Sequence, residues 1–307
     1  MQRHTPAVAD QAGNTESYGI APAGFRLPST THLGVVRLQV SDLARSLAYY
    51  DRVLGLREVE RRGRMAVLGA VDGGRPLIEL HELPGAQPVP RRGRLGLYHY
   101  AILVPDRGAL GRFVSHLATL GVYAGMSDHL VSEAIYLSDP DGLGIEVYAD
   151  RPRDTWRTEG RQIAMTTMPL DADDLVQAAG GEPWTGMPNG TVIGHVHLHV
   201  GDLAQAEAFY HDALGLDKIV WGYPGALFLS AGGYHHHLGT NTWAAGAAPA
   251  GEGDARLLEW EMILPDAETV SIVANNLELA GYTVGRSSSG TVVVHDPWGT
   301  ALRIRAE

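Results

Sequence analysis

The alternation of apolar and polar residues predicts short strands, and the first of them is followed directly by a helix. Residues Leu33–Val40 alternate in the way expected of a half-buried strand. Asp42 is a typical N-cap residue, and apolar residues recur at helical spacing from there to Gly55, where the helix is expected to end. Three further strand-like segments follow, at residues 57–62, 65–70 and 77–82. The pattern predicts a β-α-β-β-β module.

This module occurs four times along the chain. Each copy has an aspartate where the helix begins, and these are Asp42, Asp106, Asp202 and Asp266. Their spacings are 106 − 42 = 64, 202 − 106 = 96 and 266 − 202 = 64 residues. Equal spacings on either side of a longer one indicate two pairs of modules with a linker between them. We number the modules one to four in chain order.

The spacings also predict the domain organisation. Residues 1–27 are aperiodic and contain Ala, Gly and Pro, so we expect a flexible N-terminal arm. Modules one and two would form an N-terminal domain at 28–150, and modules three and four a C-terminal domain at 190–307. The linker, 151–189, carries a short amphipathic helix pattern near Asp171–Ala179. The predicted fold class is α+β, with four β-α-β-β-β modules in two domains and the helices outside the sheets.

Residues 128–148 combine a clear secondary-structure pattern with a candidate functional carboxylate. The pattern predicts a strand, a tight turn at Asp139–Gly142, and a second strand. In the second strand Ile145 and Val147 face one side, whereas Glu146 faces the other. A carboxylate on the concave face of a sheet is costly unless a positive group meets it. We therefore expect a cationic partner for Glu146.

Composition narrows the function classes. The 307 residues are 45% hydrophobic, with a net charge of -11 and no cysteine. The acidic balance argues against nucleic-acid binding, and the lack of cysteine excludes disulfides and thiolate metal sites. The sequence has no apolar run long enough to span a membrane and no signal-peptide pattern at its start. We expect a soluble, cytoplasmic protein with no membrane partner, which could form a homo-oligomer.

These features together resemble a known superfamily. The four modules, the Asp-Leu-x-x-x-x-x-Phe/Tyr-Tyr helix starts and the Asp-Pro-Asp-Gly-x-x-x-Glu ending are similar to those of vicinal oxygen chelate proteins. That superfamily includes glyoxalase I, bleomycin-resistance proteins and extradiol catechol dioxygenases. Four modules in one chain are most similar to bacterial catechol 2,3-dioxygenase-like proteins. The resemblance covers 28–307 apart from the linker, and it implies curled mixed sheets, in which two modules enclose one divalent metal.

The resemblance also implies a ligand set. Ligands in this superfamily lie on the first and last strands of a module, which gives Val35, His99, His195 and Glu259 for the first strands and Glu79, Glu146, His237 and Arg303 for the last. The extradiol dioxygenase pattern is matched by His99, Glu146 and His195, with the substrate-binding Tyr136 ten residues before Glu146. Two histidines and a carboxylate suit Fe(II), with Mn(II) or Zn(II) as other possible metals.

This assignment requires module two to pair with module three across the linker. If modules pair within each half instead, the sequence offers two other metal sets. These sets are Glu79, His99 and Glu146, or His195, His237 and Glu259. A charged group of Glu259, Glu261, Arg303 and Arg305 would share one cleft, and there a structural ion-pair network is the favoured interpretation.

A histidine-rich run at residues 234–243 is the second concentration of chemistry. Extradiol dioxygenases carry a His-His-x-Leu run with an acid/base histidine, and this motif favours His236. Strand alternation favours His237 instead, because Leu238 would face the helix. We retain both as catalytic candidates together with Tyr136. His197 and His199 share the face of His195, and with Trp243 they are the candidate substrate-binding residues.

Two functions follow from the resemblance. The first is an Fe(II)-dependent extradiol dioxygenase, which cleaves the ring of a catechol-type aromatic diol with O2. The second is a glyoxalase-like isomerase or lyase, or a ligand-sequestering protein of the bleomycin-resistance type. A fourth protein ligand, His237 or Glu79, would favour the second, whereas Tyr136 and the histidine run favour the first.

Overall fold

The computed structural model describes residues 18–71 and 75–307 and confirms the α+β fold class. Residues 1–17 of the expected N-terminal arm lie outside this part. For residues 18–27 the prediction of a flexible arm is wrong. Ile20 forms a β-bridge with Lys218, and the side chain of Leu27 is buried in the main hydrophobic core. The apolar side chain of Leu27 therefore holds this segment against the body of the protein.

Modules one and two have the predicted order of elements. Module one consists of β1 (His32–Val40), α1 (Leu43–Arg52), β2 (Arg57–Arg62), β3 (Met65–Gly69) and β4 (Pro76–Glu82). Module two consists of β5 (Gly96–Leu103), α2 (Arg107–Leu120), β6 (Gly125–Asp128), β7 (Ser132–Ser138) and β8 (Gly144–Asp150). Asp42 and Asp106 cap α1 and α2 through backbone N–H groups three residues on, as the sequence predicts.

Modules three and four repeat this order. Module three consists of β11 (Val192–His199), α4 (Leu203–Glu207), a π-helical turn η2 (Ala208–Ala213), β12 (Asp217–Val220), β13 (Ala226–Ser230) and β14 (Leu238–Asn241). Module four consists of β15 (Arg256–Leu264), α5 (Ala267–Leu279), β16 (Val284–Arg286), β17 (Val292–His295) and β18 (Ala301–Ala306). The linker contains η1 (Arg153–Thr155), β9 (Thr158–Glu159), β10 (Gln162–Ile163) and α3 (Ala172–Ala178). The helix predicted in the linker is therefore confirmed.

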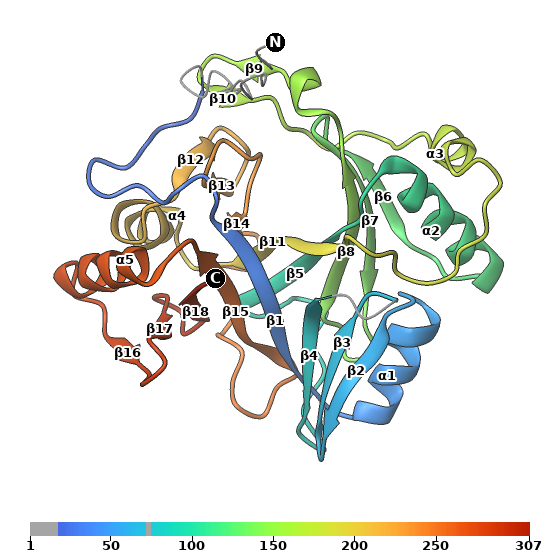
Figure 1. The fold of residues 1–307 in the computed structure, drawn as a ribbon, viewed down its shortest axis with the longest axis horizontal. Helices are drawn as coiled ribbons and strands as arrows, with labels where there is room; N and C mark the ends of the chain where they lie inside the picture. The colour runs from blue at the N-terminus through green and yellow to red at the C-terminus, as the bar shows by residue number, and fades with distance from the viewer. Residues whose placement is uncertain (1–17, 72–74) are drawn as a thin grey trace, which may run out of the picture.

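The two sheets do not follow the two halves of the sequence. One eight-stranded sheet has the order β12-β13-β14-β11-β5-β8-β7-β6, so it joins modules three and two. The other has the order β16-β17-β18-β15-β1-β4-β3-β2 and joins modules four and one. Figure 1 shows β1, β5, β11 and β15 in the middle of the molecule and the helices α1, α2, α4 and α5 at its outside. The division at 150 and 190 describes halves of the sequence, and each sheet takes one module from each half.

Hydrogen bonds from buried tyrosines tie the modules of one half together. Tyr50 of α1 in module one donates to Asp139 in the turn of module two, at 3.4 Å. Tyr210 of module three donates to Asp296 in the turn of module four, at 2.9 Å. One continuous hydrophobic core lies between the helices and both sheets. In the described part of the chain, no helix is long and apolar enough to cross a membrane.

Candidate metal centre

Three neighbouring strands in the middle of one sheet bring His99, Glu146 and His195 together. β5 lies between β8 and β11 and pairs with both. It is parallel to β8, where Ala101 is opposite Glu146, and antiparallel to β11, where Ala101 is opposite His195. The small side chain of Ala101, which is fully buried, leaves room between the two larger ones. The pairing of modules two and three therefore creates this cluster.

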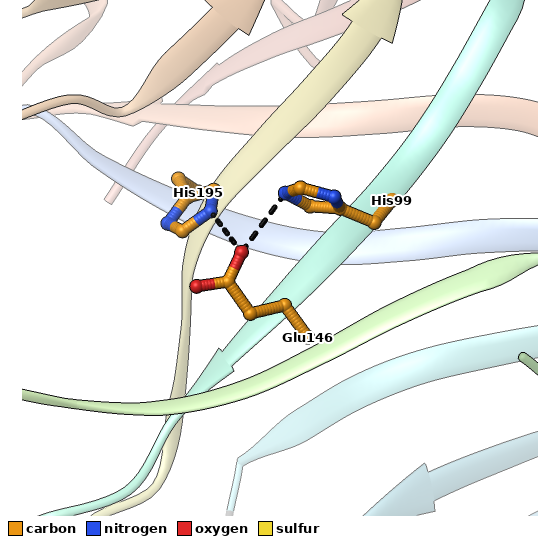
Figure 2. Close-up of side chains that lie close together, drawn as sticks. All are labelled: His99, Glu146 and His195. Atoms are coloured by element: carbon orange, nitrogen blue, oxygen red, sulfur yellow. Dashed lines mark hydrogen bonds and ion pairs between the residues drawn. The ribbon is translucent and has the colours of Figure 1, made fainter. Parts of the chain in front are cut away.

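The two imidazoles meet at one carboxylate oxygen. Nε2 of His99 is 2.9 Å and Nε2 of His195 is 3.1 Å from Oε2 of Glu146. Figure 2 shows both imidazoles directed at this oxygen. The side chains of all three residues are buried. One ligand atom from each lies within 4.8 Å of the others. This separation lets a single ion contact all three groups.

The protonation states of this cluster suit a cation. Burial lowers the pKa of His195 to about 4, so its ring is neutral near pH 7. Burial by itself would raise the pKa of Glu146. The adjacent His195 and His99 outweigh that effect and hold the pKa well below its ordinary value. An ionised carboxylate beside a neutral imidazole is the state in which such residues bind metals.

The hydrogen bonds of the cluster are incomplete in a way that fits a metal ion. Nε2 of His99 is close to Glu146, yet the direction of this contact does not satisfy a hydrogen bond. Among the described residues this buried nitrogen has no hydrogen-bond partner. A buried polar atom without a partner is costly, and a metal ion would satisfy it. The three side chains therefore form a set that could hold a divalent metal ion.

The within-half ligand sets are excluded by the sheet topology. Glu79 and Glu259 belong to the sheet of modules one and four, where both pair with the guanidinium of Arg37 at 3.1 and 3.0 Å. Glu259 also pairs with Arg303 at 2.7 Å, and Glu261 pairs with Arg305 at 3.2 Å. The ion-pair network predicted for this cleft is thus confirmed. Arg37 lies among its carboxylates and supplies a positive charge there.

A cavity of about 210 Å³ lies beside the cluster of His99, Glu146 and His195. His99 and Glu146 contribute to its wall, whereas the rest of the lining is largely aromatic and apolar. The lining residues are Tyr98, His99, Ser127, His129, Ser132, Tyr136, Glu146, Met165, Thr166, Thr167, His197, Tyr223, Phe228, His236 and Trp243. A cavity of this size and lining suits a small aromatic ligand.

Tyr136 lies in this cavity wall in a defined hydrogen-bonded position. Its hydroxyl is 2.6 Å from Nε2 of His129, and Nδ1 of His129 is 2.7 Å from the carbonyl oxygen of Thr166. A carbonyl only accepts, so Nδ1 of His129 carries the hydrogen and Nε2 accepts from Tyr136 when the ring is neutral. Burial raises the pKa of Tyr136 well above its ordinary value, so it remains a phenol near pH 7.

The structure separates the two candidate acid/base histidines. His236 lines the cavity, with its ring centroid 4.0 Å from that of His195. His237 points elsewhere, and its Nδ1 is 3.0 Å from Oγ of Ser230 and 3.2 Å from the backbone N–H of Ala231. β14 begins only at Leu238, so the histidines precede it and strand alternation does not decide between them. The geometry therefore supports His236 as a cavity residue and gives His237 no contact with the cavity.

The three candidate substrate-binding residues lie close together around Asn241. Its Oδ1 accepts from the backbone N–H of Trp243 at 3.0 Å and from Nδ1 of His199 at 2.7 Å. Nδ2 of Asn241 therefore donates to Nε2 of His197 at 3.0 Å. His197 and Trp243 line the cavity, whereas His199 and Trp243 line a neighbouring opening of about 840 Å³.

Several cavity residues were not predicted from the sequence. Tyr98 and Phe228 add aromatic surface, and residues 165–167 of the linker form one side of the cavity. Tyr98 directly precedes His99, so simple alternation would place it on the opposite face. Register shifts between β5 and β11 break this alternation. The linker segment has no sequence pattern that indicates a cavity, since its position depends on how the modules pack.

Comparison with known proteins places this fold and site in a family. Residues 32–147 and 192–304 match the Glyoxalase/Bleomycin resistance protein/Dioxygenase superfamily. The chain therefore belongs to that superfamily, and the resemblance seen in the sequence is confirmed. Catechol-2,3-dioxygenase of Bacillus subtilis (strain 168) is 48% identical over 272 residues, which cover 87% of this chain and 94% of that protein. The chain is thus an enzyme, a relative of catechol-2,3-dioxygenase.

Solved structures show the same fold at low sequence identity. A putative dioxygenase from Bacillus subtilis subsp. subtilis str. 168 has a TM-score of 0.63 at 16% identity, covering 92% of this chain and 86% of that one. Glyoxalase I from Zea mays has a TM-score of 0.52 at 17% identity, covering 90% of this chain and 92% of that one. At these identities the likeness shows the fold alone, so the reaction has to be argued from the site.

Proposed function

We propose that this enzyme is an Fe(II)-dependent extradiol dioxygenase, which cleaves the ring of a catechol-type diol with O2. The observation that carries the proposal is the meeting of His99, His195 and Glu146 in one buried cluster beside a small aromatic-lined cavity. A two-histidine, one-carboxylate set is typical of non-haem Fe(II) oxygenases. The relationship to catechol-2,3-dioxygenase supports the same substrate class.

The metal would be held by His99, His195 and Glu146. When bound, a divalent iron ion supplies open coordination positions and redox chemistry for a chelating diol and dioxygen. The protein contributes a neutral imidazole at His195 and an ionised carboxylate at Glu146. Glu146 and His99 form part of the cavity wall, so the substrate's hydroxyl groups would approach them with the ring against the aromatic side chains.

The side chains around His99, Glu146 and His195 would bind the diol and accept one of its protons. Tyr98, Phe228 and Trp243 offer aromatic surface to the ring and limit the space for water. Burial lowers the pKa of His236 well below its ordinary value, so its ring is neutral and can accept a proton from a diol hydroxyl. The hydroxyl of Tyr136 donates to His129, which leaves its oxygen able to accept a hydrogen bond from a ligand in the cavity. Together these groups orient the diol and remove one of its protons.

The number of ligands argues against the glyoxalase-like alternative. That class is expected to use four protein ligands, with His237 or Glu79 as the fourth. In the described part of the chain, the metal-competent cluster holds three residues. His237 is hydrogen-bonded to Ser230, and Glu79 is paired with Arg37 in the other sheet. The three-ligand set is therefore better suited to a dioxygenase.

An oxygen-dependent assay tests this function. The purified protein is loaded with Fe(II) under anaerobic conditions, catechol is added, and air-saturated buffer starts the reaction. We expect a yellow ring-cleavage product and stoichiometric O2 uptake with the Fe(II) protein. Protein loaded with Zn(II), and Glu146→Gln protein treated with Fe(II), serve as matched controls and should form no product. If Fe(II) binds but neither catechol nor alkyl-substituted catechols consume O2, the proposed activity is wrong.

A further inference from the structure

A chain of hydrogen bonds runs from His236 in the cavity wall through His235 to Asp150 at the end of β8. The Nδ1 atoms of His236 and His235 are 2.7 Å apart, and Nε2 of His235 is 2.9 Å from Oδ1 of Asp150. The side chain of His235 is fully buried, whereas that of Asp150 is 27% exposed. Neither residue lines the cavity, so neither can touch a ligand there.

The chemistry of these atoms fixes where the hydrogens lie. A carboxylate only accepts hydrogen bonds, so Nε2 of His235 carries a hydrogen. A neutral His235 then has its lone pair on Nδ1. The hydrogen between the two rings therefore belongs to Nδ1 of His236, and a neutral His236 has its lone pair on Nε2. This nitrogen is the one left for the cavity.

The surroundings hold this chain in place. Oδ1 of Asp150 also accepts from the hydroxyl of Tyr234 at 3.2 Å, and that hydroxyl is 2.7 Å from the hydroxyl of Tyr148. The rings of Tyr234 and Trp156 lie against His235, with centroids 4.1 and 5.3 Å away. His235 therefore has little room to rotate, and the carboxylate it contacts is itself anchored.

We propose that Asp150 and His235 are positioning residues that keep His236 in the tautomer with its lone pair on Nε2. The arrangement follows the logic of a catalytic triad, in which a carboxylate orients a histidine through the nitrogen that does not react. Here a second imidazole lies between the carboxylate and the reacting ring. The expected effect of this positioning on kcat rests on the proposed function. The tautomer of His236 itself can be measured without turnover.

The tautomer is tested by nuclear magnetic resonance. Protein labelled with 15N-histidine and loaded with diamagnetic Zn(II) is observed by long-range 15N–1H correlation, and His236→Gln identifies the resonances of His236. We expect a protonated Nδ1 and an unprotonated Nε2 in the unmodified protein near pH 7. In Asp150→Leu the carboxylate is lost, and we expect the Nε2-protonated form of His236 to become populated. A protonated Nε2 in the unmodified protein, or an unchanged tautomer in Asp150→Leu, would overturn the proposal.

Kinetics of the Fe(II) enzyme supply the second readout. Asp150→Leu should lower kcat about 100-fold, within the usual range for an acid/base group, with KM and metal content changed by less than about 2-fold. Asp150→Asn keeps an acceptor oxygen for His235, so it should retain about 10-fold more activity than Asp150→Leu. Asp217→Asn is the matched control, because it removes a buried carboxylate from the same sheet, where it pairs with Arg26.

The outcomes separate this inference from the proposed function. If neither the unmodified protein nor any variant turns over catechol, the proposed function is wrong. The tautomer measurement then still decides the inference about Asp150 and His235. If the unmodified enzyme is active and Asp150→Leu keeps a kcat within about 3-fold of Asp217→Asn, the positioning role is wrong. Equal losses in Asp150→Asn and Asp150→Leu would also contradict it, because the conservative variant should restore the acceptor.

Discussion

His195 and Glu146 are 49 residues apart and lie on strands that do not pair with each other, yet Nε2 of His195 is 3.1 Å from Oε2 of Glu146. β5 separates their strands in the sheet and pairs with both. The contact therefore exists only because β5 of module two and β11 of module three are adjacent. A metal centre at this point would join the two halves of the sequence.

His236→Phe should keep the metal and lose turnover. The ring lines the cavity but belongs to none of the three ligand residues, so metal content should be unchanged. Removal of an acid/base group typically lowers kcat by about 10²–10⁴-fold. His237→Gln is the comparison, because His237 contacts Ser230 away from the cavity and its replacement should change kcat by less than about 3-fold. The reverse order of effects, measured by O2 uptake, would restore the alternation argument.

Much of the fold could be predicted from the sequence because the signals were local. Alternation and the N-cap aspartates gave the four modules, and the structure confirms their order. Module pairing is not a local property, since it depends on which apolar sheet edges meet. The 64–96–64 spacing suggested domains built from consecutive modules, whereas β1 pairs with β15 and β5 pairs with β11. Only the ligand pattern across modules two and three indicated this arrangement.

The site residues that lie within strands could be predicted from their positions along those strands. The site residues whose positions depend on how segments pack could not. His99, Glu146 and His195 share a face because residues on paired strands have fixed registers. The histidines lie before the start of β14, so alternation along that strand does not decide which of His236 and His237 lines the cavity. The Asp150 contact with His235 joins residues 85 apart and had no sequence signal.

Arg37→Met should destabilise the protein. The Arg37 guanidinium pairs with Glu79 and Glu259 at 3.1 and 3.0 Å and lies 3.8 Å from Glu261. Its removal leaves buried or half-buried carboxylates near one another, which typically costs about 3 kcal/mol. Urea unfolding measures the loss in free energy of unfolding. Arg61→Met removes the exposed pair with Glu58 and should cost less than about 0.5 kcal/mol. If Arg37→Met costs as little as Arg61→Met, the ion-pair network adds no stability.

Asp139→Asn should change how stability depends on pH. Burial raises the pKa of Asp139 to about 7, above its ordinary value near 4. The folded protein therefore holds this proton more tightly than the unfolded chain. The resulting stability is fully present below about pH 4 and is lost as the pH rises to about 7.

In the variant the amide cannot titrate, although it keeps an acceptor oxygen for the N–H groups of Asp141 and Leu143. Relative to Asp139→Asn, the unmodified protein should lose roughly 4 kcal/mol of unfolding free energy between pH 4 and pH 7. Urea unfolding at several pH values measures the difference. Parallel pH profiles for the two proteins would contradict the raised pKa.

Metal content of His195→Ala tests the central claim, which is that one metal site spans modules two and three. Proteins are loaded with Fe(II) anaerobically, desalted and analysed by inductively coupled plasma mass spectrometry, with circular dichroism to confirm folding. His116→Ala is the control. In the described part of the chain, the one hydrogen bond of the His116 ring is to the carbonyl oxygen of Arg52. We predict one ion per chain in the unmodified protein and in His116→Ala, and loss of most of it in His195→Ala. Full occupancy in folded His195→Ala would contradict the account.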